Sequence, residues 1–543
     1  MASKKKNKPV AVVAGDVMID WNLAVDRDRV VAVRSWAEAG NVRGVPQRGG
    51  AWLLEDLVRH LDAEHMYDVR GIPDHDDVHQ TYTVTRRASD GVLRIHEFVG
   101  VQHREKMPPR LVANDDPAAA IVALLDSDLD FDSTREAWPK AIVEKKRNPW
   151  VVLKTSVPDF RQELWSHLVD EHADRLIVVM TVEDLRRKEM RLIRRLSWER
   201  TAQDLVTELQ KSAALQALRR CRHLVVSFGT AGAMLVPRDE DPQLVFDPAA
   251  MEQEWAPEKN PSGSMIGYAT VLAAVVTHEV MLHYDHPQIA DALPRAILRM
   301  RTLFENGYGK DDKNPHVDLD AIAAPDMKGK KKPVLSTAVL REPARRSWTI
   351  LEDRLNRVAK NIPGGKVEDA LYELAARVAV FGPEEALAEV PQLRIGNLFT
   401  VDREEIESYR SIKALLSEYV EGTQSEPVSI AVFGSPGSGK SFGVKEIATA
   451  VGGKKKITPL TFNLTQFARA EDLRGAFHQV RDVSLRGEIP LVFWDEFDTT
   501  YGDKALGWLR YFISPMQDGL FQEDQITHPI GRSIFVFAGG TAT

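Results

Sequence analysis

The chain has 543 residues, of which 43% are hydrophobic and 28% charged, and its formal net charge is −8. This length predicts about two to four domains, and the mildly acidic balance argues against nucleic-acid binding, which usually needs a basic face. The single cysteine, Cys221, excludes an intramolecular disulfide and suits a reducing compartment. We expect it to be a buried small hydrophobe.

The N-terminal segment is first basic and then apolar. Residues 1–9 are predicted to form a basic tail, and Val10–Ala14 a short strand. Asp16 and Asp20 interrupt the apolar character that an export signal would continue. No run approaches the roughly 18 apolar residues of a membrane-spanning helix. We therefore expect a cytoplasmic protein without a membrane partner.

Strand and helix patterns alternate over the next 250 residues or so. Ala51–Ala63 has the apolar period of a helix, and residues 81–87 and 92–100 alternate like a hairpin joined by a Ser-Asp-Gly turn. Three short, nearly continuous apolar runs follow, at residues 150–156, 175–181 and 223–229. Such runs are typical of a parallel sheet covered by helices on both faces. The predicted fold class is therefore α/β.

Composition also suggests where the chain divides. Residues 327–346 are basic and contain proline, which is typical of a linker, and residues 347–388 have a helical pattern. We predict a first domain over 10–326, a linker and helical connector over 327–400, and a second α/β domain over 401–543.

A glycine-rich motif lies in the second predicted domain. Gly434, Gly439, Lys440 and Ser441 complete the pattern G-x-x-x-x-G-K-S, between a predicted strand at Ser429–Phe433 and a predicted helix at Phe442–Val451. The loop between the glycines consists of Ser435, Pro436, Gly437 and Ser438. Backbone N–H groups of such a loop converge on phosphate oxygens, and the helix N-terminus adds partial positive charge. Lys440 is predicted to meet the β- and γ-phosphates of ATP, and Ser441 to bind Mg²⁺.

An acidic pair supports this interpretation. Asp495 and Glu496 follow an apolar strand at Leu491–Trp494, about 50 residues after the glycine-rich loop. A carboxylate at this position can hold Mg²⁺, and its neighbour can orient and deprotonate the attacking water. We predict Asp495 as a metal ligand, and Glu496 and Lys440 as catalytic residues.

These motifs resemble the Walker A and Walker B segments of the AAA+ ATPase family over about Val401–Thr543. The resemblance implies ATP binding, self-association into a ring or cluster, and hydrolysis across subunit interfaces. It places a sensor residue at Thr541. The chain ends before the further strand, arginine finger and helical lid of that family, so we expect an incomplete core and a fragment of a longer polypeptide.

The first predicted domain resembles the ribokinase (PfkB) family over about Lys8–Gly309, which implies a three-layer α/β/α domain. The resemblance rests on the order of several short motifs. Asp20 matches the residue that grips sugar or nucleoside hydroxyls, and Gly49 and Gly50 match a glycine pair. Gly229 and Gly232 match a strand turn near the family's ATP site.

The chain departs from this family at its catalytic motifs. Where the family has G-A-G-D at a helix start, this sequence has Gly263, Ser264, Met265 and Ile266, so the general base becomes an alkyl side chain. The family's N-x-x-E motif falls at Thr181 and Asp184, and Trp52 and Leu53 stand where a polar Asn is usual. We predict a kinase fold without kinase chemistry.

A binding pocket is still predicted in the first domain. It is lined by Asp20, Gly49, Gly50, Gly263 and Ser264, and a helix N-terminus at Ser262–Ser264 is able to receive an anion. The predicted ligand is a nucleoside, a nucleotide or a sugar phosphate.

The combined prediction is an ATP-hydrolysing AAA+ signalling or remodelling protein whose first domain senses a ligand. By analogy, such fusions act with effector proteins in bacterial defence or stress responses. Two alternatives stay open at this point: an active sugar or nucleoside kinase with a regulatory ATPase module, and a nucleotide-dependent assembly scaffold.

Overall fold

A computed structural model divides the chain into two compact units, Met1–Pro391 and Gln392–Thr543. The residues that it describes are 8–25, 44–76, 78–86, 90–102, 109–144, 146–156, 163–187, 190–212, 215–252, 263–325, 334–341, 348–362, 365–434, 439–453 and 456–540. No helix within these ranges combines the length and the apolar character that a membrane crossing requires.

The first unit is built on a nine-stranded sheet in the order β13-β12-β11-β10-β9-β8-β7-β1-β4. Strands from β4 to β10 pair in parallel, and β11 to β13 continue the sheet antiparallel. The predicted strand at Val10 and the three apolar runs all lie in this sheet, so these predictions are confirmed. In chain order the strands are β1 (Val10–Gly15), β4 (Asp68–Arg70), β7 (Ile121–Asp126), β8 (Trp150–Thr155), β9 (Leu176–Thr181), β10 (His223–Ser227), β11 (Gly232–Pro237), β12 (Gln243–Phe246) and β13 (Ser336–Val339).

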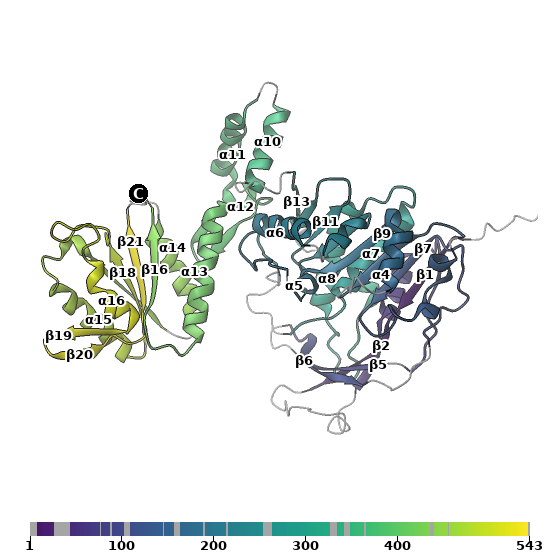
Figure 1. Ribbon diagram of the computed structural model, residues 1–543, viewed down its shortest axis with the longest axis horizontal. Helices are drawn as coiled ribbons and strands as arrows, with labels where there is room; N and C mark the ends of the chain where they lie inside the picture. Colours follow the sequence, from purple (N-terminus) through teal and green to yellow (C-terminus); the bar gives the residue numbers. More distant parts are fainter. Residues whose placement is uncertain are drawn as a thin grey trace, which may run out of the picture. The chain divides into compact units, whose positions relative to one another are not determined.

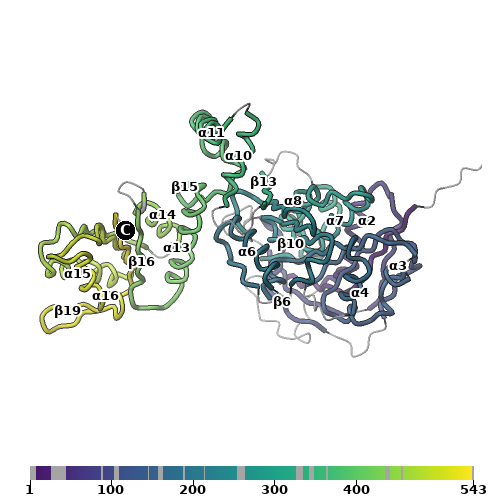
Figure 2. Tube along the Cα trace, turned by 45° about the horizontal axis from the view of Figure 1, so that its top comes forward, coloured from purple at the N-terminus to yellow at the C-terminus, as the bar shows by residue number. Residues whose placement is uncertain are grey.

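Helices cover both faces of this sheet and make three layers (Figure 1). Successive residues of a strand enter opposite cores: Val13 and Ala123 belong to one core, Val12 and Val122 to the other. The first core is closed by α2 (Ala51–Leu61), α7 (Tyr268–Leu282), α8 (Ile289–Asn306) and α9 (Leu319–Ala323), of which α2, α7 and α8 lie side by side (Figure 2). The second core is closed by α3 (Lys140–Val143), α4 (Glu163–Glu171), α5 (Val182–Arg187) and α6 (Trp198–Lys211). Burial on both faces explains the continuous apolar runs.

A smaller sheet in the order β3-β2-β5-β6 completes the first unit. Its strands are β2 (Val17–Ala24), β3 (Gly44–Gly50), β5 (Val78–Arg86) and β6 (Leu93–Gln102). β5 and β6 form the predicted antiparallel hairpin. The chain passes from the large sheet to the small one at Gly15, whose φ is 137° and whose added Cβ would lie 2.0 Å from the Leu125 carbonyl oxygen. Only glycine tolerates both conditions.

The predicted linker and helical connector, 327–400, contains the expected helices and also a strand that its composition does not indicate. β13 lies within it and extends the large sheet, because its backbone pairs with β12 and Ala338 enters the second core. The helices α10 (Ile350–Asn361), α11 (Val367–Phe381) and α12 (Pro383–Ala386) follow. The boundary between the units falls after Pro391 rather than at 400. Proline and lysine content could not reveal this long-range strand pairing.

The second unit has a four-stranded parallel sheet in the order β16-β21-β18-β17. Its two faces form separate cores, with Phe493 in one and Trp494 in the other. This α/β arrangement agrees with the predicted fold class. The strands are β16 (Val428–Phe433), β17 (Ile457–Asn463), β18 (Ile489–Asp495) and β21 (Ile534–Gly539), with hairpins β14 (Leu393–Ile395)–β15 (Leu398–Thr400) and β19 (Leu520–Glu523)–β20 (Ile526–Pro529), and the helices are α13 (Arg403–Glu421), α14 (Lys440–Gly452), α15 (Asp472–Leu485) and α16 (Ile513–Gln517).

Candidate functional sites

The glycine-rich loop of the second unit connects a strand to a helix, as predicted. β16 ends at Phe433, and α14 begins at Lys440 after Gly439, which caps the helix with a φ of 79°. The hydroxyl-bearing side chain of Ser441 is exposed at this helix start. The predicted ligand-binding residues Ser435, Pro436, Gly437 and Ser438 lie outside the described residues, as does Thr541.

Strand order brings the acidic pair to the sheet edge at which β16 ends, just before the glycine-rich loop. β21 lies between β16 and β18, with Phe433 beside Gly539 and Asp495 beside Ala538. All three strands are parallel, so their carboxyl ends meet at one edge of the sheet, where α/β proteins bind their ligands. Two contacts tie this edge together: Gly434 N donates to Gly539 O over 3.4 Å, and the Phe433 and Phe497 rings lie 5.6 Å apart.

The backbone after β18 turns sharply at Glu496. Its φ of 54° is left-handed, which is unusual for a residue with a side chain, and the side chain is exposed. Such conformations persist where surrounding contacts hold them, often at functional sites. Here Phe497 N donates to Ala538 O over 3.4 Å, and Asp498 Oδ2 accepts from Gly540 N over 3.1 Å. The turn thus holds Glu496 at the sheet edge next to Asp495.

In the first unit, the structure brings Asp20 together with Gly49. Asp20 lies on β2 and Gly49 on the adjacent β3. An added Cβ at Gly49 would lie 2.5 Å from Asp20 Oδ2, so the carboxylate occupies the space of a side chain there. Gly50 has a φ of 60°, and its added Cβ would lie 2.3 Å from Asp16 O. Both glycines are therefore required by the local geometry.

The polar atoms around Asp20 are buried without protein partners. Among the described residues, Asp20 Oδ1 and both amide atoms of Asn22 make no hydrogen bond. On the neighbouring strand β5, Gln80 lies beside Asp20 and Tyr82 lies beside Asn22. The Tyr82 hydroxyl donates to Gln80 Oε1 over 2.6 Å. Buried polar groups are nearly always satisfied in proteins. This cluster is therefore a place where a polar ligand would supply the missing partners.

Burial governs the ionisation of this cluster. It raises the pKa of Asp20 to about 7, because little water or positive charge compensates a buried carboxylate. It also raises the pKa of Tyr308 well above its usual value, with the nearby Asp20 and Tyr82 as further causes. A shifted carboxyl in a polar, buried setting is characteristic of ligand sites.

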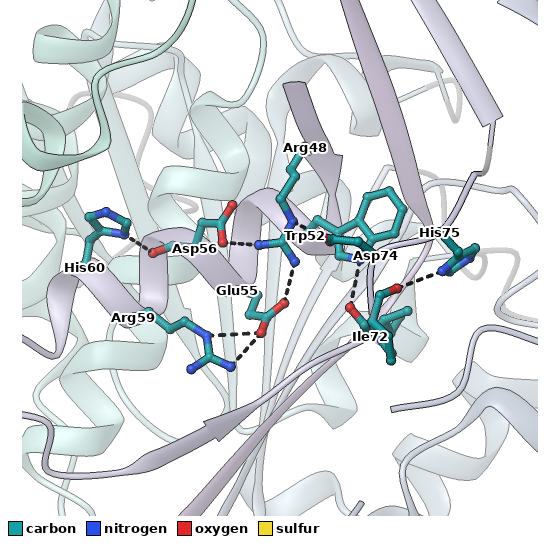
Figure 3. Close-up of polar contacts among 10 residues, drawn as sticks. Arg48, Trp52, Glu55, Asp56, Arg59, His60, Ile72, Asp74 and His75 are labelled. Carbon is teal, nitrogen blue, oxygen red and sulfur yellow. Dashed lines mark hydrogen bonds and ion pairs between the residues drawn. The ribbon is translucent and has the colours of Figure 1, made fainter. Parts of the chain in front are cut away.

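A charge cluster anchors the glycine pair to the helix that follows it (Figure 3). Arg48 Nη2 donates to Glu55 Oε2 over 2.9 Å, its Nη1 binds Asp56, and its Nε lies 3.1 Å from Asp74 Oδ1. Trp52 donates its Nε1–H to Ile72 O over 2.9 Å. Trp52 therefore has a packing role, and Arg48 fixes β3 on α2.

The prediction of a helix start at Ser262–Ser264 is wrong. Ser264 forms an antiparallel bridge to β6, in which it exchanges two 3.0 Å backbone hydrogen bonds with Ile95. α7 begins at Tyr268, after Gly267 with a φ of 92°. Because glycines stand at positions 263 and 267, the sequence is compatible with a helix start after either one. Only the pairing of Ser264 with β6 shows that the helix starts after the second glycine. The predicted anion-binding helix end at Gly263 is therefore absent.

The same shift decides which residue opens the helix. The residue that opens the helix after a glycine is Tyr268, and Ile266 precedes the helix. Burial raises the pKa of Tyr268 above its usual range, so the phenol stays protonated at neutral pH. Neither Ile266 nor Tyr268 is able to accept a proton there.

The side chains of Thr181 and Asp184, which the sequence analysis placed at the N-x-x-E motif, hydrogen-bond to each other within one turn. Thr181 donates to Asp184 Oδ2 from its backbone N over 3.0 Å and from Oγ1 over 2.6 Å, and Asp184 N donates back to Thr181 Oγ1 over 3.1 Å. This arrangement starts α5.

Asp16 also has a structural role, because its carboxylate accepts backbone N–H groups from Ser127, Leu129 and Phe131 at 2.7–3.3 Å.

Sequence reasoning missed several residues of these sites. Asn22, two positions after Asp20 on the same strand face, was detectable from the strand period of two. Asp498 lies within the same acidic stretch as Glu496. Tyr82 and Tyr308 reach the Asp20 cluster through tertiary packing alone, so no local pattern indicated them.

The chain was compared with known families, curated proteins and solved structures. No family description matches the sequence, and no curated protein does. The solved structure of Arabidopsis thaliana ribokinase complexed with ribose and ATP is similar, with 16% identity over 58% of this chain and 97% of that chain and a TM-score of 0.36. Burkholderia thailandensis nucleoside kinase in complex with inosine has 9% identity over 58% and 95%, with a TM-score of 0.32.

Aminoimidazole riboside kinase from Salmonella enterica is similar too, with 12% identity over 58% of this chain and 99% of that chain and a TM-score of 0.32. At these values the similarity identifies neither family nor activity. None of the three is an AAA+ ATPase, so the AAA+ assignment of Val401–Thr543 stays a prediction.

Proposed function

We propose that the second unit binds and hydrolyses Mg²⁺–ATP, and that the first unit binds a hydroxyl-rich small molecule without phosphorylating it. The observation that supports this best is that the ends of β16 and β18, which carry Gly434 and Asp495, meet at one sheet edge. Gly434 and Phe433 lie on one side of β21, and Asp495 and Glu496 on the other.

Each residue of this edge has a role in the proposed reaction. N–H groups of the loop and of the α14 N-terminus hold the phosphates, and Lys440 neutralises the β- and γ-phosphates. The Ser441 hydroxyl and the Asp495 carboxylate are hard oxygen donors, which suit Mg²⁺. Glu496 accepts a proton from the water that attacks the γ-phosphorus. Self-association and an effector protein remain part of this proposal through the AAA+ resemblance alone.

The first unit is assigned ligand binding because of the Asp20 cluster. Asp20 and Asn22 offer unpaired buried acceptors and donors, which match the hydroxyls of a sugar or nucleoside. Phosphoryl transfer would need a base near the helix start, and Ile266 and Tyr268 supply none. The absence of a base lowers such a rate by about 10²–10⁴-fold.

The test measures ADP production by the full chain with a panel of sugars and nucleosides, in the wild type and in Lys440→Ala. We expect ATP hydrolysis in the wild type and none in Lys440→Ala, with every panel compound. Binding of a panel compound to Lys440→Ala, measured by calorimetry, is expected to disappear in Asp20→Asn.

Two results would contradict this proposal. ADP production by Lys440→Ala that depends on one compound would favour an active kinase. Absence of ATP binding in the wild type would overturn the proposed role of the second unit, and normal activity of both Lys440→Ala and Glu496→Gln in cells would favour an assembly scaffold.

A further inference from the structure

Two histidines and a glutamate converge on one surface of the second unit, on elements that the proposed function does not use. His478 lies on α15, Glu523 ends β19, and His528 lies on β20. Their ligand atoms all lie within 4.8 Å of one another, and all three side chains are half-buried. Among the described residues this is the one group of three or more such side chains with this spacing.

The spacing of these atoms matches a metal coordination shell. His478 Nε2 lies 2.9 Å and His528 Nε2 3.6 Å from the same oxygen, Glu523 Oε2. Bonds of about 2.0–2.1 Å in a tetrahedral zinc site place neighbouring ligand atoms about 3.4 Å apart. We propose that His478, Glu523 and His528 bind a divalent transition metal of the Zn²⁺ type. Two imidazoles and one carboxylate are a ligand set that such metals prefer.

The scaffold holds the three side chains in place without a metal. Phe521 pairs with His528 across the β19–β20 hairpin and is buried in the core against α15. Its ring lies 5.0 Å from the His478 ring and 5.2 Å from the His528 ring. The hairpin turns tightly at Asp524, with a φ of 52°. Binding therefore needs little ordering of the ligands, which favours affinity.

Arg481 opposes the metal in this arrangement. Its Nη1 donates to His528 Nδ1 over 3.3 Å, so His528 carries its proton on Nε2 in the metal-free state. A metal on Nε2 requires the other tautomer, with the proton on Nδ1, and Arg481 then loses its acceptor. Arg481 is also a cation close to the site. Metal binding must displace its guanidinium, and removal of this side chain should tighten binding.

The site would fasten the β19–β20 hairpin to α15. Three protein ligands leave coordination positions for water or for an external ligand, as in zinc sites that are not purely structural. β19 and β20 lie in the chain between β18, whose end carries the acidic pair of the proposed nucleotide site, and β21, which pairs with β18 on one side and β16 on the other. The metal site itself contains no residue of that nucleotide site, so its test is independent.

The test uses the full chain after chelator treatment and titrates it with Co²⁺ as a spectroscopic probe. We expect one equivalent of Co²⁺ to give the visible d–d absorption of a four- or five-coordinate site, and Zn²⁺ to abolish it by competition. His478→Gln, Glu523→Gln and His528→Gln should each weaken binding by more than about 100-fold, beyond the loss caused by an outer-shell change. Arg481→Gln should tighten it several-fold.

Two controls make the result specific. His316→Gln removes an exposed histidine of the first unit, and Lys440→Ala silences the proposed nucleotide site; both should bind Co²⁺ like the wild type. Circular dichroism checks that the variants are folded. A wild type without the absorption band, or a band of equal strength in His478→Gln and His528→Gln, would overturn the proposal. If a ligand variant fails to fold, the wild-type titration and Arg481→Gln still decide.

Discussion

The two units use similar α/β layers but place their candidate sites in opposite environments. In the first unit Asp20 is 5% exposed, and one of its carboxylate oxygens has no hydrogen-bond partner within the part of the chain that the structure describes. In the second unit Glu496 is exposed on a left-handed turn at the sheet edge. Packing and desolvation therefore define the first site, and local backbone geometry defines the second.

The pKa shifts of carboxyl groups also differ between the two units. Burial raises the pKa of Asp16 to about 6 and that of Asp20 to about 7, and it also raises the pKa of Asp126. In the second unit, hydrogen bonds lower the pKa of the exposed Asp472 and of the half-buried Glu488 instead. Burial thus makes these three carboxyl groups of the first unit costly to ionise, whereas hydrogen bonds favour the ionised form of the two carboxyl groups of the second unit.

The strongest test of the comparison removes phosphate binding from one unit only. Lys440→Ala is expected to weaken ATP binding by more than about 100-fold, because the phosphates lose the cation that neutralises their charge. Fluorescent ATP-analogue binding measures this. Lys445→Ala, one helical turn later on the exposed side of α14, should bind ATP normally. Equal binding by both variants would remove the phosphate site from this loop.

A smaller effect separates binding from hydrolysis at the second site. Glu496→Gln keeps the hydrogen-bonding shape of the side chain but cannot accept a proton. We expect ATP binding within about twofold of the wild type and a turnover rate lower by about 10²–10⁴-fold. Phosphate release measures the rate. Asp503→Asn, an exposed acidic residue after the same strand, should hydrolyse ATP normally.

The raised pKa of Asp20 predicts in which direction the stability of the first unit changes with pH. The pKa of Asp20 is raised in the folded state, so the folded state binds more protons between about pH 4 and pH 7, and stability falls as pH rises through this window. Asp20→Asn removes this loss. Its free energy of unfolding relative to the wild type should increase by up to about 4 kcal/mol from pH 4 to pH 8.

Thermal or denaturant unfolding of both proteins at several pH values measures this difference. Asp285→Asn, an exposed acidic residue of the first unit, should follow the wild type at every pH. A constant difference between Asp20→Asn and the wild type would mean that Asp20 is ionised as freely as in water.

The smallest expected effect is on stability, when one glycine in each unit is replaced by alanine. Gly49→Ala places a Cβ 2.5 Å from Asp20 Oδ2 and should destabilise the first unit by about 1–3 kcal/mol. Gly475→Ala lies within α15, where an added Cβ meets nothing within 4 Å, and should stabilise the second unit by about 0.5–1 kcal/mol. Denaturant unfolding compares the two. If both substitutions destabilised the protein, α15 would have to be packed more tightly around Gly475 than the structure shows.

The sequence by itself determined the elements whose causes are local. The alternation of strands and helices, the β5–β6 hairpin, and the loop from Gly434 to Ser441 between a strand and a helix follow from side-chain period and turn chemistry. Asp495 and Glu496 at the end of β18 could likewise be predicted, because a strand end is visible in the sequence.

Tertiary structure decided what depends on long-range pairing and burial. β13 joins the large sheet only through hydrogen bonds to β12, and α7 starts at Tyr268 because Ser264 pairs with β6. The raised pKa of Asp20 and its missing partners arise from desolvation, which no local pattern encodes. His478 and His528 stand 50 positions apart and meet only where the hairpin packs on α15.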